Sequence, residues 1–271
     1  MPNIRPLHIV LVGCGKMGSS MMQGWLKNNL IESATILDPH GISEELKSSD
    51  KLVHAQTAAD IDMSVIDLIA LAVKPQIMKV VCNDLSPHVP ETTPILSIVA
   101  GQSIASITKY FKENQPVIRS MPNTPAAIGK GITAAISNHS VSHETEKAVT
   151  ALLTSSGELV RLDDESQMDA VTALSGSGPA YIFHLIEVMT QSGIKLGLSE
   201  EQAIQLARQT VIGAAHLAEA QSETPASNLR ENVTSPGGTT AAALEKLMDG
   251  RLQDIYDEAL SAAKARSIEL S

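Results

Sequence analysis

A glycine-rich segment near the start of the chain, Gly13-Cys-Gly15-Lys-Met-Gly18, has the spacing of a loop that binds phosphate groups. It directly follows the apolar run His8–Val12 and opens a run with helical periodicity. The first glycine permits a tight turn, the second lets backbone N–H groups approach a pyrophosphate, and the third lets the helix pack closely. The helix N-terminus also favours an anion. The segment therefore predicts a dinucleotide-binding loop, and a glycine-rich turn that binds no nucleotide is the alternative.

Asp38 follows the next β-rich run, close to the spacing expected for an acid that contacts the adenosine ribose. A carboxylate there accepts hydrogen bonds from ribose hydroxyls and repels a 2′-phosphate, so Asp38 taken alone favours NAD over NADP. The alternative is an acid that opens an Asp-Pro-His-Gly turn. His40 and Lys51 are the only nearby groups in the sequence that could contact a phosphate.

Two more loops are expected where strands end at their carboxyl side, which is where open α/β sheets bind ligands. They are Ala72–Pro75 after the fourth run and Met121–Pro125 after the sixth. Pro75 and Pro122 would end the strands and leave backbone carbonyls and the Asn123 amide free to contact a cofactor. Turn formation alone explains both loops equally well.

Two helix entrances later in the chain carry hydroxyl and glycine residues. Leu174–Tyr181 reads LSGSGPAY, with serines before a proline in the first turn. Asn232–Thr240 reads NVTSPGGTT and leads into AAALEKLM. A Gly-Gly turn before two threonines exposes several unpaired N–H groups, which favours a small carboxylate with a hydroxyl beside it. Simple N-capping is the alternative.

Composition excludes several classes of function. The chain has 271 residues, a formal net charge of −10 and only one Trp, three Tyr and two Phe. It therefore lacks the basic surface and the stacking platforms of nucleic-acid binders. The two cysteines have no metal or redox spacing, no apolar run is long enough to span a membrane, and no metal site is expected. HExxH, GxSxG and P-loop motifs are absent. A cytoplasmic globular protein is the simplest interpretation.

The first part of the chain alternates β-rich runs with helix-length segments, which predicts βαβ units and a parallel sheet. Val65–Val73 is almost entirely apolar and should form a central strand. The other expected strands are His8–Val12, Ala34–Leu37, Leu52–His54, Pro94–Val99, Val117–Met121, Gly131–Ile136 and Glu158–Leu162, with a helix at Glu144–Thr154.

After Leu162 the strand-like runs stop, and Ala- and Leu-rich helical stretches follow at Ala180–Leu196, Glu200–Glu219 and Leu252–Ile268. These helices carry apolar residues on much of their circumference, more than about 110 residues can bury alone. We therefore predict an α/β protein: a Rossmann-type parallel-sheet domain at 1–162, and an all-helical domain at 163–271 that packs against a partner chain.

The motifs GCGKMG, AVKP, MPNTPA, ALSGSGPAY and LRENVTSPGGTTAAAL together resemble the pyrroline-5-carboxylate reductase family, in the family's order and over essentially the whole chain. The last motif is highly specific. The resemblance implies a Rossmann domain followed by a helical dimerisation and substrate-binding domain, in a homodimer that often assembles into rings of dimers. It also implies NAD(P)H-dependent reduction of 1-pyrroline-5-carboxylate to L-proline, the last step of proline biosynthesis.

The resemblance also implies a role for individual positions. Substrate contacts would come from Glu165, Ser235, Gly238, Thr239 and Thr240, with the substrate carboxylate on the backbone N–H groups of Gly238 and Thr239. Thr240 would be the catalytic residue, its hydroxyl beside the ring nitrogen. Cofactor contacts would come from Asn232 of the partner chain and from Gly13, Cys14, Gly15, Lys16, Met17, Gly18, Asp38, Thr57, Ala72, Val73, Lys74, Pro75 and Ala100.

The implied cofactor is NADP, yet the chain departs from the commonest family pattern at the ribose, where many members have Ser, Asn, Thr or Arg in place of Asp38. We therefore expect NADP to be used and NAD to be accepted as well. The chemistry fits the residues: a cyclic imine arrives protonated, so hydride transfer needs positioning and a carboxylate anchor more than a strong acid.

Two other functions are alternatives. A β-hydroxyacid dehydrogenase shares the two-domain plan, but needs a catalytic lysine on the helix after SGSGPAY, where the first lysine is Lys195 at the far end. A regulator that binds NAD(P) without catalysis would have no use for an intact Thr240 loop.

Overall fold

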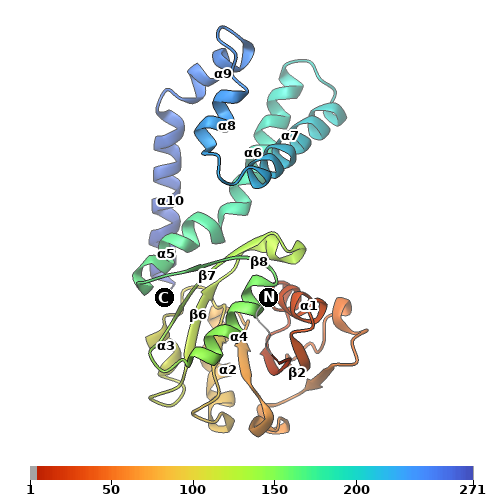
Figure 1. Ribbon diagram of the computed structural model, residues 1–271, viewed down its shortest axis with the longest axis vertical. Coiled ribbons are helices and arrows are strands. Elements are labelled where there is room, and N and C mark those ends of the chain that lie inside the picture. Colours follow the sequence, from red (N-terminus) through yellow and green to blue (C-terminus); the bar gives the residue numbers. More distant parts are fainter. Residues whose placement is uncertain (1–4, 271) are drawn as a thin grey trace. The chain divides into compact units, whose positions relative to one another are not determined.

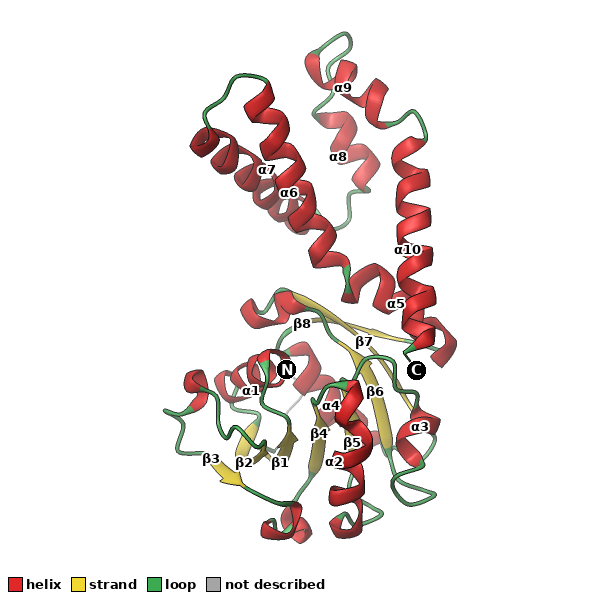
Figure 2. Cartoon of the chain, turned by 180° about the vertical axis from the view of Figure 1, so that it is seen from behind, coloured by secondary structure: helices red, strands yellow, loops and turns green. Residues whose placement is uncertain are grey.

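The computed structural model describes residues 5–270, in which eight strands form one sheet in the order β3-β2-β1-β4-β5-β6-β7-β8 (Figures 1 and 2). The first six strands run parallel, as predicted, which gives the Rossmann arrangement. The strands are β1 Leu7–Val12, β2 Ile31–Leu37, β3 Leu52–Ala55, β4 Leu68–Leu71, β5 Ile95–Ser97, β6 Val117–Met121, β7 Gly131–Ser137 and β8 Gly157–Arg161.

The sheet departs from a fully parallel one at β7, which pairs antiparallel with β6. The connection between them, residues 122–130, is too short for the crossover that a parallel pair requires. β8 then pairs parallel with β7, after the helix α4 His143–Thr154. β4 is shorter than the predicted Val65–Val73 because Met63–Val65 forms a 3-10 turn, but it is central and fully buried as expected.

Helices cover both faces of the sheet (Figures 1 and 2). Ile9 and Leu11 of β1 belong to one buried cluster, while Val10 and Val12 belong to the other. The first cluster includes α1 Lys16–Lys27 and α4, and the second includes α2 Met78–Leu85 and α3 Ile104–Thr108. Strands buried on both faces are continuous apolar runs, which is why the sequence identified them.

The chain divides into two compact units. One extends to Ser177 and includes the chain again from Ala263, and the other is Gly178–Ala262. The sequence places a boundary after Leu162 for a different reason, because the segment from residue 163 on is expected to dimerise and to bind substrate. That assignment stays a prediction. The remaining helices are α5 Met168–Val171, α6 Gly178–Lys195, α7 Glu200–Ala220, α8 Ala226–Asn232, α9 Thr239–Leu247 and α10 Arg251–Glu269.

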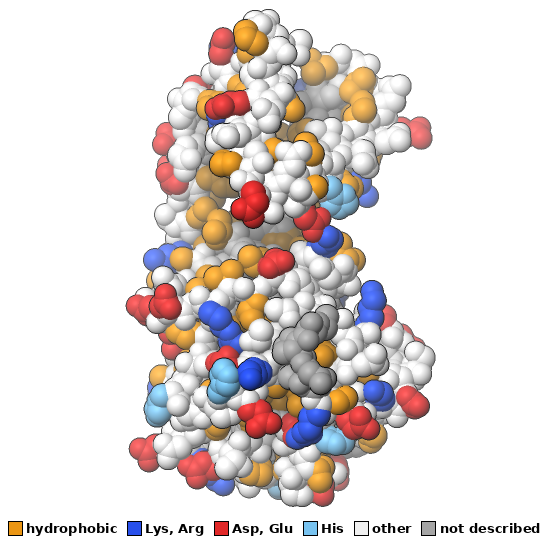
Figure 3. All heavy atoms as spheres, viewed as in Figure 1, with side chains coloured by type: hydrophobic (Ala, Val, Ile, Leu, Met, Phe, Trp, Pro, Cys, Tyr) orange, Lys and Arg blue, Asp and Glu red, His pale blue; other side chains and the backbone are white. Residues whose placement is uncertain are grey.

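The second unit has very little interior of its own. Within Gly178–Ala262, a segment that the structure describes throughout, only Thr190, Ala203 and Ala207 are buried. Large apolar side chains such as Phe183, at 60% exposure, and Ile255, at 62%, lie at its surface. Apolar side chains are visible over the helices of this unit in Figure 3. None of the described helices is long and apolar enough to cross a membrane.

Candidate functional site

The glycine loop has the geometry that its three glycines predict. Gly13 adopts φ +93°, and a Cβ there would lie 2.7 Å from the Ala72 carbonyl oxygen. A Cβ on Gly18 would lie 2.5 Å from the Gly13 carbonyl oxygen. A Cβ on Gly15 would meet nothing within 4 Å. The tight turn and the close packing are therefore present, and the space beside Gly15 is open to a ligand.

The start of α1 adds an anion site to this open space. Its N-cap, Gly15, provides no side-chain cap, and neither Gly15 nor Lys16 is buried. The first N–H groups of a helix have no partner within the helix, so those at the start of α1 are available to a phosphate. The residues present therefore fit the pyrophosphate of a dinucleotide.

Asp38 lies at the end of β2 and is bound by two backbone N–H groups. Its Oδ2 accepts the Cys14 N–H at 2.7 Å, and its Oδ1 accepts the His40 N–H at 2.8 Å. The second contact closes the Asp-Pro-His-Gly turn, while the first ties this turn to the glycine loop. The side chain thus has the role of a turn residue and also lies at the edge of the dinucleotide loop. Whether it contacts a ribose is a prediction.

The groups around Asp38 differ from those expected. The Lys51 ammonium donates to the Ile31 carbonyl at 2.7 Å, at the start of β2, and so lies at the opposite end of that strand. His54 is the group that sequence reasoning missed: its Nε2 lies 2.9 Å from the Asp38 carbonyl oxygen. Because a carbonyl only accepts, this nitrogen carries the proton. The parallel pairing of β2 and β3 could have indicated it, since His54 is in register with Ile36.

The loops after β3, β4 and β5 reach the same carboxyl edge. Ala72 is close to Gly13, and its N–H donates to the Val12 carbonyl at 2.8 Å. Thr57 caps a 3-10 turn through Asp60, to which its N–H and its hydroxyl donate. Ala100 follows β5 beside Gly101, whose φ is +72°. The strand order therefore gathers the predicted cofactor residues of this unit at one edge.

The Asn123 amide is not free, contrary to expectation. Its Nδ2 donates to the Ser175 carbonyl at 3.1 Å and its Oδ1 accepts the Ile132 N–H at 2.9 Å. The amide thus ties the end of β6 to the LSGSG segment, where Thr172–Gly176 forms a π-helical turn. Such turns are frequent at functional sites.

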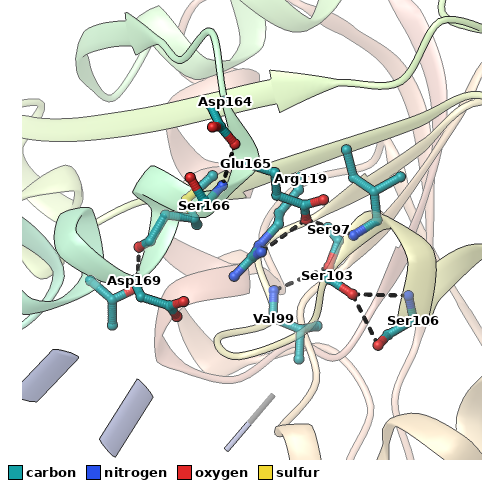
Figure 4. A network of polar contacts seen from close by, with 12 residues as sticks. Ser97, Val99, Ser103, Ser106, Arg119, Asp164, Glu165, Ser166 and Asp169 are labelled. Atoms are coloured by element: carbon teal, nitrogen blue, oxygen red, sulfur yellow. Dashed lines mark hydrogen bonds and ion pairs between the residues drawn. The ribbon is translucent and has the colours of Figure 1, made fainter. Parts of the chain in front are cut away.

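Glu165 belongs to the same unit as the sheet and forms a largely buried ion pair. Its Oε1 accepts from Arg119 Nη1 at 2.8 Å and from the Ile104 N–H at 2.7 Å (Figure 4). The Arg119 side chain is 7% exposed and that of Glu165 29%. Arg119 is a residue that sequence reasoning missed, although a single charge in the apolar run VIRSM was a signal for a buried partner.

The second motif loop lies in the helical unit. Gly237 adopts φ +70°, the Gly238 N–H donates to the Ser235 carbonyl at 3.0 Å, and Gly238 is the N-cap of α9 without a side-chain cap. Thr239 and Thr240 are the first two residues of the helix. Their N–H groups are available to an acceptor, and Thr240 adds a hydroxyl.

Two further features bear on the chemistry. Burial raises the pKa of the Cys82 thiol to about 12, so at neutral pH this group is a protonated, unreactive thiol.

A groove of about 650 Å³ lies at the opposite, amino edge of the sheet, between Arg5, Met63 and Thr145. None of the motif loops lines it.

Comparisons with known proteins agree with this geometry. Residues 165–270 match the family described as pyrroline-5-carboxylate reductase dimerisation, and residues 8–101 match the family described as NADP oxidoreductase coenzyme F420-dependent. A pyrroline-5-carboxylate reductase of Pseudomonas aeruginosa is 40% identical over 97% of both chains. The chain belongs to the pyrroline-5-carboxylate reductase family.

Solved structures of this family have the same fold. A pyrroline-5-carboxylate reductase from Coxiella burnetii superposes with a TM-score of 0.88 at 32% identity, covering 98% of both chains. The Plasmodium falciparum pyrroline carboxylate reductase with NADP bound gives 0.84 at 29% identity, covering 99% of both chains. As a member of the pyrroline-5-carboxylate reductase family, the chain is an oxidoreductase with an NADP-binding Rossmann fold.

Proposed function

We propose that this chain catalyses the reaction for which its family is named, the reduction of 1-pyrroline-5-carboxylate to L-proline with NADPH, as the last step of proline biosynthesis. The observation that carries the proposal is the presence in one chain of two uncapped helix starts of different kinds. One is the open loop at Gly15, which suits a pyrophosphate. The other is the Gly238 start of α9, which suits a small carboxylate beside a hydroxyl.

The cofactor would be held at the carboxyl edge of the sheet. The N–H groups at the start of α1 would bind the pyrophosphate, and Asp38 would lie at the adenosine ribose with Thr57 nearby. Ala72, Val73, Lys74, Pro75 and Ala100 would line the path toward the nicotinamide. When bound, NADPH supplies the hydride. NAD is accepted as well, because a carboxylate at Asp38 suits a free ribose hydroxyl.

The substrate would be anchored by its carboxylate on the N–H groups of Gly238 and Thr239, in the loop that begins at Ser235. Thr240 Oγ1 would hydrogen-bond the ring nitrogen and orient the imine carbon for attack. Because the imine is protonated, the nitrogen needs a hydrogen-bond partner rather than a strong acid. Glu165 would lie close to the substrate in the assembled enzyme.

The assembly proposed is a homodimer, further arranged as a ring of dimers, in the cytoplasm. The apolar surface of α6, α7 and α10 supports association of this unit with a second copy. Asn232, exposed at the end of α8, would then contact the cofactor of the partner chain. Each site would be complete only in the dimer.

A β-hydroxyacid dehydrogenase activity is disfavoured by the position of Lys195. This lysine is the last residue of α6, which begins at Gly178, so about 25 Å of helix separates it from the entrance where a catalytic lysine is required. The test is a substrate panel: purified protein with NADPH and pyrroline-5-carboxylate, and with NADP and β-hydroxy acids. Turnover of the β-hydroxy acids alone would overturn the proposal.

A further inference from the structure

Arg119 and Glu165 join three segments of the first unit that are distant in sequence (Figure 4). Arg119 comes from the middle of β6, Glu165 from the 3-10 turn Glu165–Gln167 after β8, and Ile104 is the first residue of α3. A single oxygen, Glu165 Oε1, accepts from both the guanidinium and the Ile104 N–H. Because Arg119 is only 5% exposed, solvent screens this ion pair weakly.

The contact to Ile104 adds a second cap to the start of α3. Ser103 is the N-cap, and its Oγ accepts the Ser106 N–H at 3.1 Å. That hydroxyl satisfies the third N–H of the helix and leaves the first one, at Ile104, without a helical acceptor. Glu165 supplies the missing acceptor at 2.7 Å. The start of α3 therefore depends on a side chain 61 residues further along the chain.

The loop fixed in this way is the one that carries Ala100. At its beginning, Ser97 Oγ accepts the Val99 N–H at 3.2 Å, and the Ser97 carbonyl accepts the Ser120 hydroxyl at 3.1 Å. At its end, Ser103 and Glu165 hold the first turn of α3. In its middle, Gly101 packs so closely on the chain end that a Cβ would lie 2.9 Å from the Leu270 carbonyl oxygen. The loop is thus held at its start, middle and end.

We infer that Arg119 and Glu165 are positioning residues for the cofactor, acting by holding the loop between β5 and α3 in the shape that receives NADPH. This inference rests on the proposed function, in which Ala100 contacts the cofactor. It gives Glu165 a role that needs no contact with substrate. This positioning role differs in its chemistry from a substrate contact. Positioning depends on Glu165 as a hydrogen-bond acceptor, whereas a substrate contact would depend on the negative charge of Glu165 near the cationic ring.

Glu165→Ala and Glu165→Gln separate these two roles. The alanine variant removes the acceptor from Arg119 and from Ile104, so the dissociation constant of NADPH, measured by fluorescence titration without substrate, should rise about 10-fold. The glutamine variant keeps an acceptor oxygen for the Ile104 N–H but loses the negative charge beside Arg119, so its NADPH dissociation constant should rise less than that of the alanine variant. Glu146→Ala is the matched control, because it removes another ion pair of the same unit, the one of 2.5 Å to Arg161. It should leave NADPH affinity unchanged.

Arg119→Lys provides a second variant that keeps the buried positive charge. It loses the rigid fork of the guanidinium, so NADPH affinity should fall several-fold while the KM for pyrroline-5-carboxylate stays unchanged. The inference is overturned if the parent is active and Glu165→Ala binds NADPH normally. It is also overturned if both Glu165 variants bind NADPH as the parent does and raise only the KM for pyrroline-5-carboxylate, since that would make Glu165 a substrate contact and not a positioning residue. An inactive parent would instead contradict the proposed function.

Discussion

At the residue scale, Asp38 has one of the two roles that the sequence offered for it, that of a turn residue, and its contact with a ribose stays a prediction. Its carboxylate closes the turn through the His40 N–H and reaches the glycine loop through the Cys14 N–H. Each carboxylate oxygen can accept more than one hydrogen bond, so these contacts leave capacity for a ribose hydroxyl. They also hold the negative charge at the loop, where it would face a 2′-phosphate. Cofactor choice should therefore depend on this one side chain.

Asp38→Ser should raise kcat/KM for NADPH and lower it for NADH, shifting their ratio at least several-fold. Removing the charge relieves a repulsion of about 1 kcal/mol at water-like screening, and more where the site is drier. Asp62→Ser is the matched control, because Asp62 accepts the Ser64 N–H in a similar turn at the other edge of the sheet. An unchanged ratio in Asp38→Ser would mean that the acid is a turn residue only.

Thr240→Ala should lower kcat/KM for pyrroline-5-carboxylate about 10- to 100-fold, equivalent to roughly 1.4–2.7 kcal/mol. The change removes the hydroxyl expected at the ring nitrogen, while the α9 start retains its N–H groups. The NADPH dissociation constant should not change. Thr145→Ala, in the first turn of α4, controls for the loss of a threonine hydroxyl at a helix start. Equal activity of Thr240→Ala and the parent would make the hydroxyl merely structural.

At the element scale, the sequence predicted the sheet well because buried parallel strands are continuous apolar runs. It predicted the glycine loop well because the geometry of Gly13 and Gly18 permits no side chain. The sequence did not predict the features that are set by pairing between distant segments. Three features depend on which distant segments become neighbours. They are the antiparallel direction of β7, the hydrogen bond from Asn123 to Ser175, and the position of Lys51 at the opposite end of β2 from Asp38. Local pattern does not carry that information.

Asp67 gives an element-scale prediction, since it joins the starts of β1 and β4. It accepts from Arg5 Nη1 at 2.9 Å and from the His8 N–H at 2.9 Å. Burial raises the pKa of the Asp67 carboxyl, but hydrogen bonds and the Arg5 charge outweigh this and hold the pKa below its ordinary value of 3.8. The carboxylate therefore stabilises the fold above that pH, and the contribution is lost as the pH falls through the lowered pKa.

Asp67→Asn should lower the melting temperature at pH 7 by about 2–4 °C, corresponding to roughly 1 kcal/mol. The difference from the parent should shrink as the pH falls below 3.8, because the parent then loses the same charge. Thermal scans between pH 7 and pH 2 measure this. A difference that stays constant over the whole range would show that the charge of Asp67 is not what stabilises the fold.

At the scale of the whole molecule, the helical unit requires a partner. With so few buried residues in Gly178–Ala262, its apolar helix faces must be covered by another chain. The match to a dimerisation family over residues 165–270 agrees. The proposed function adds that the active site is completed by a second chain, so activity should depend on assembly.

Sedimentation at micromolar concentration should therefore show no monomer. Leu206→Glu, on a side chain of α7 that is 55% exposed in the single chain, should weaken the assembly and lower activity with it. Val80→Glu is the matched control, because Val80 is 72% exposed on α2 in the other unit. A stable and fully active monomer would refute the shared site and the role of Asn232.

The path of the hydride tests the proposed reduction of pyrroline-5-carboxylate by NADPH. The protein is incubated with pyrroline-5-carboxylate and NADPH carrying deuterium at both C4 positions, and the product is analysed by mass spectrometry and NMR. Direct hydride transfer predicts L-proline with one deuterium, located at C5, the former imine carbon. Deuterium lost to solvent, deuterium at another carbon, or no proline at all would contradict the proposed function.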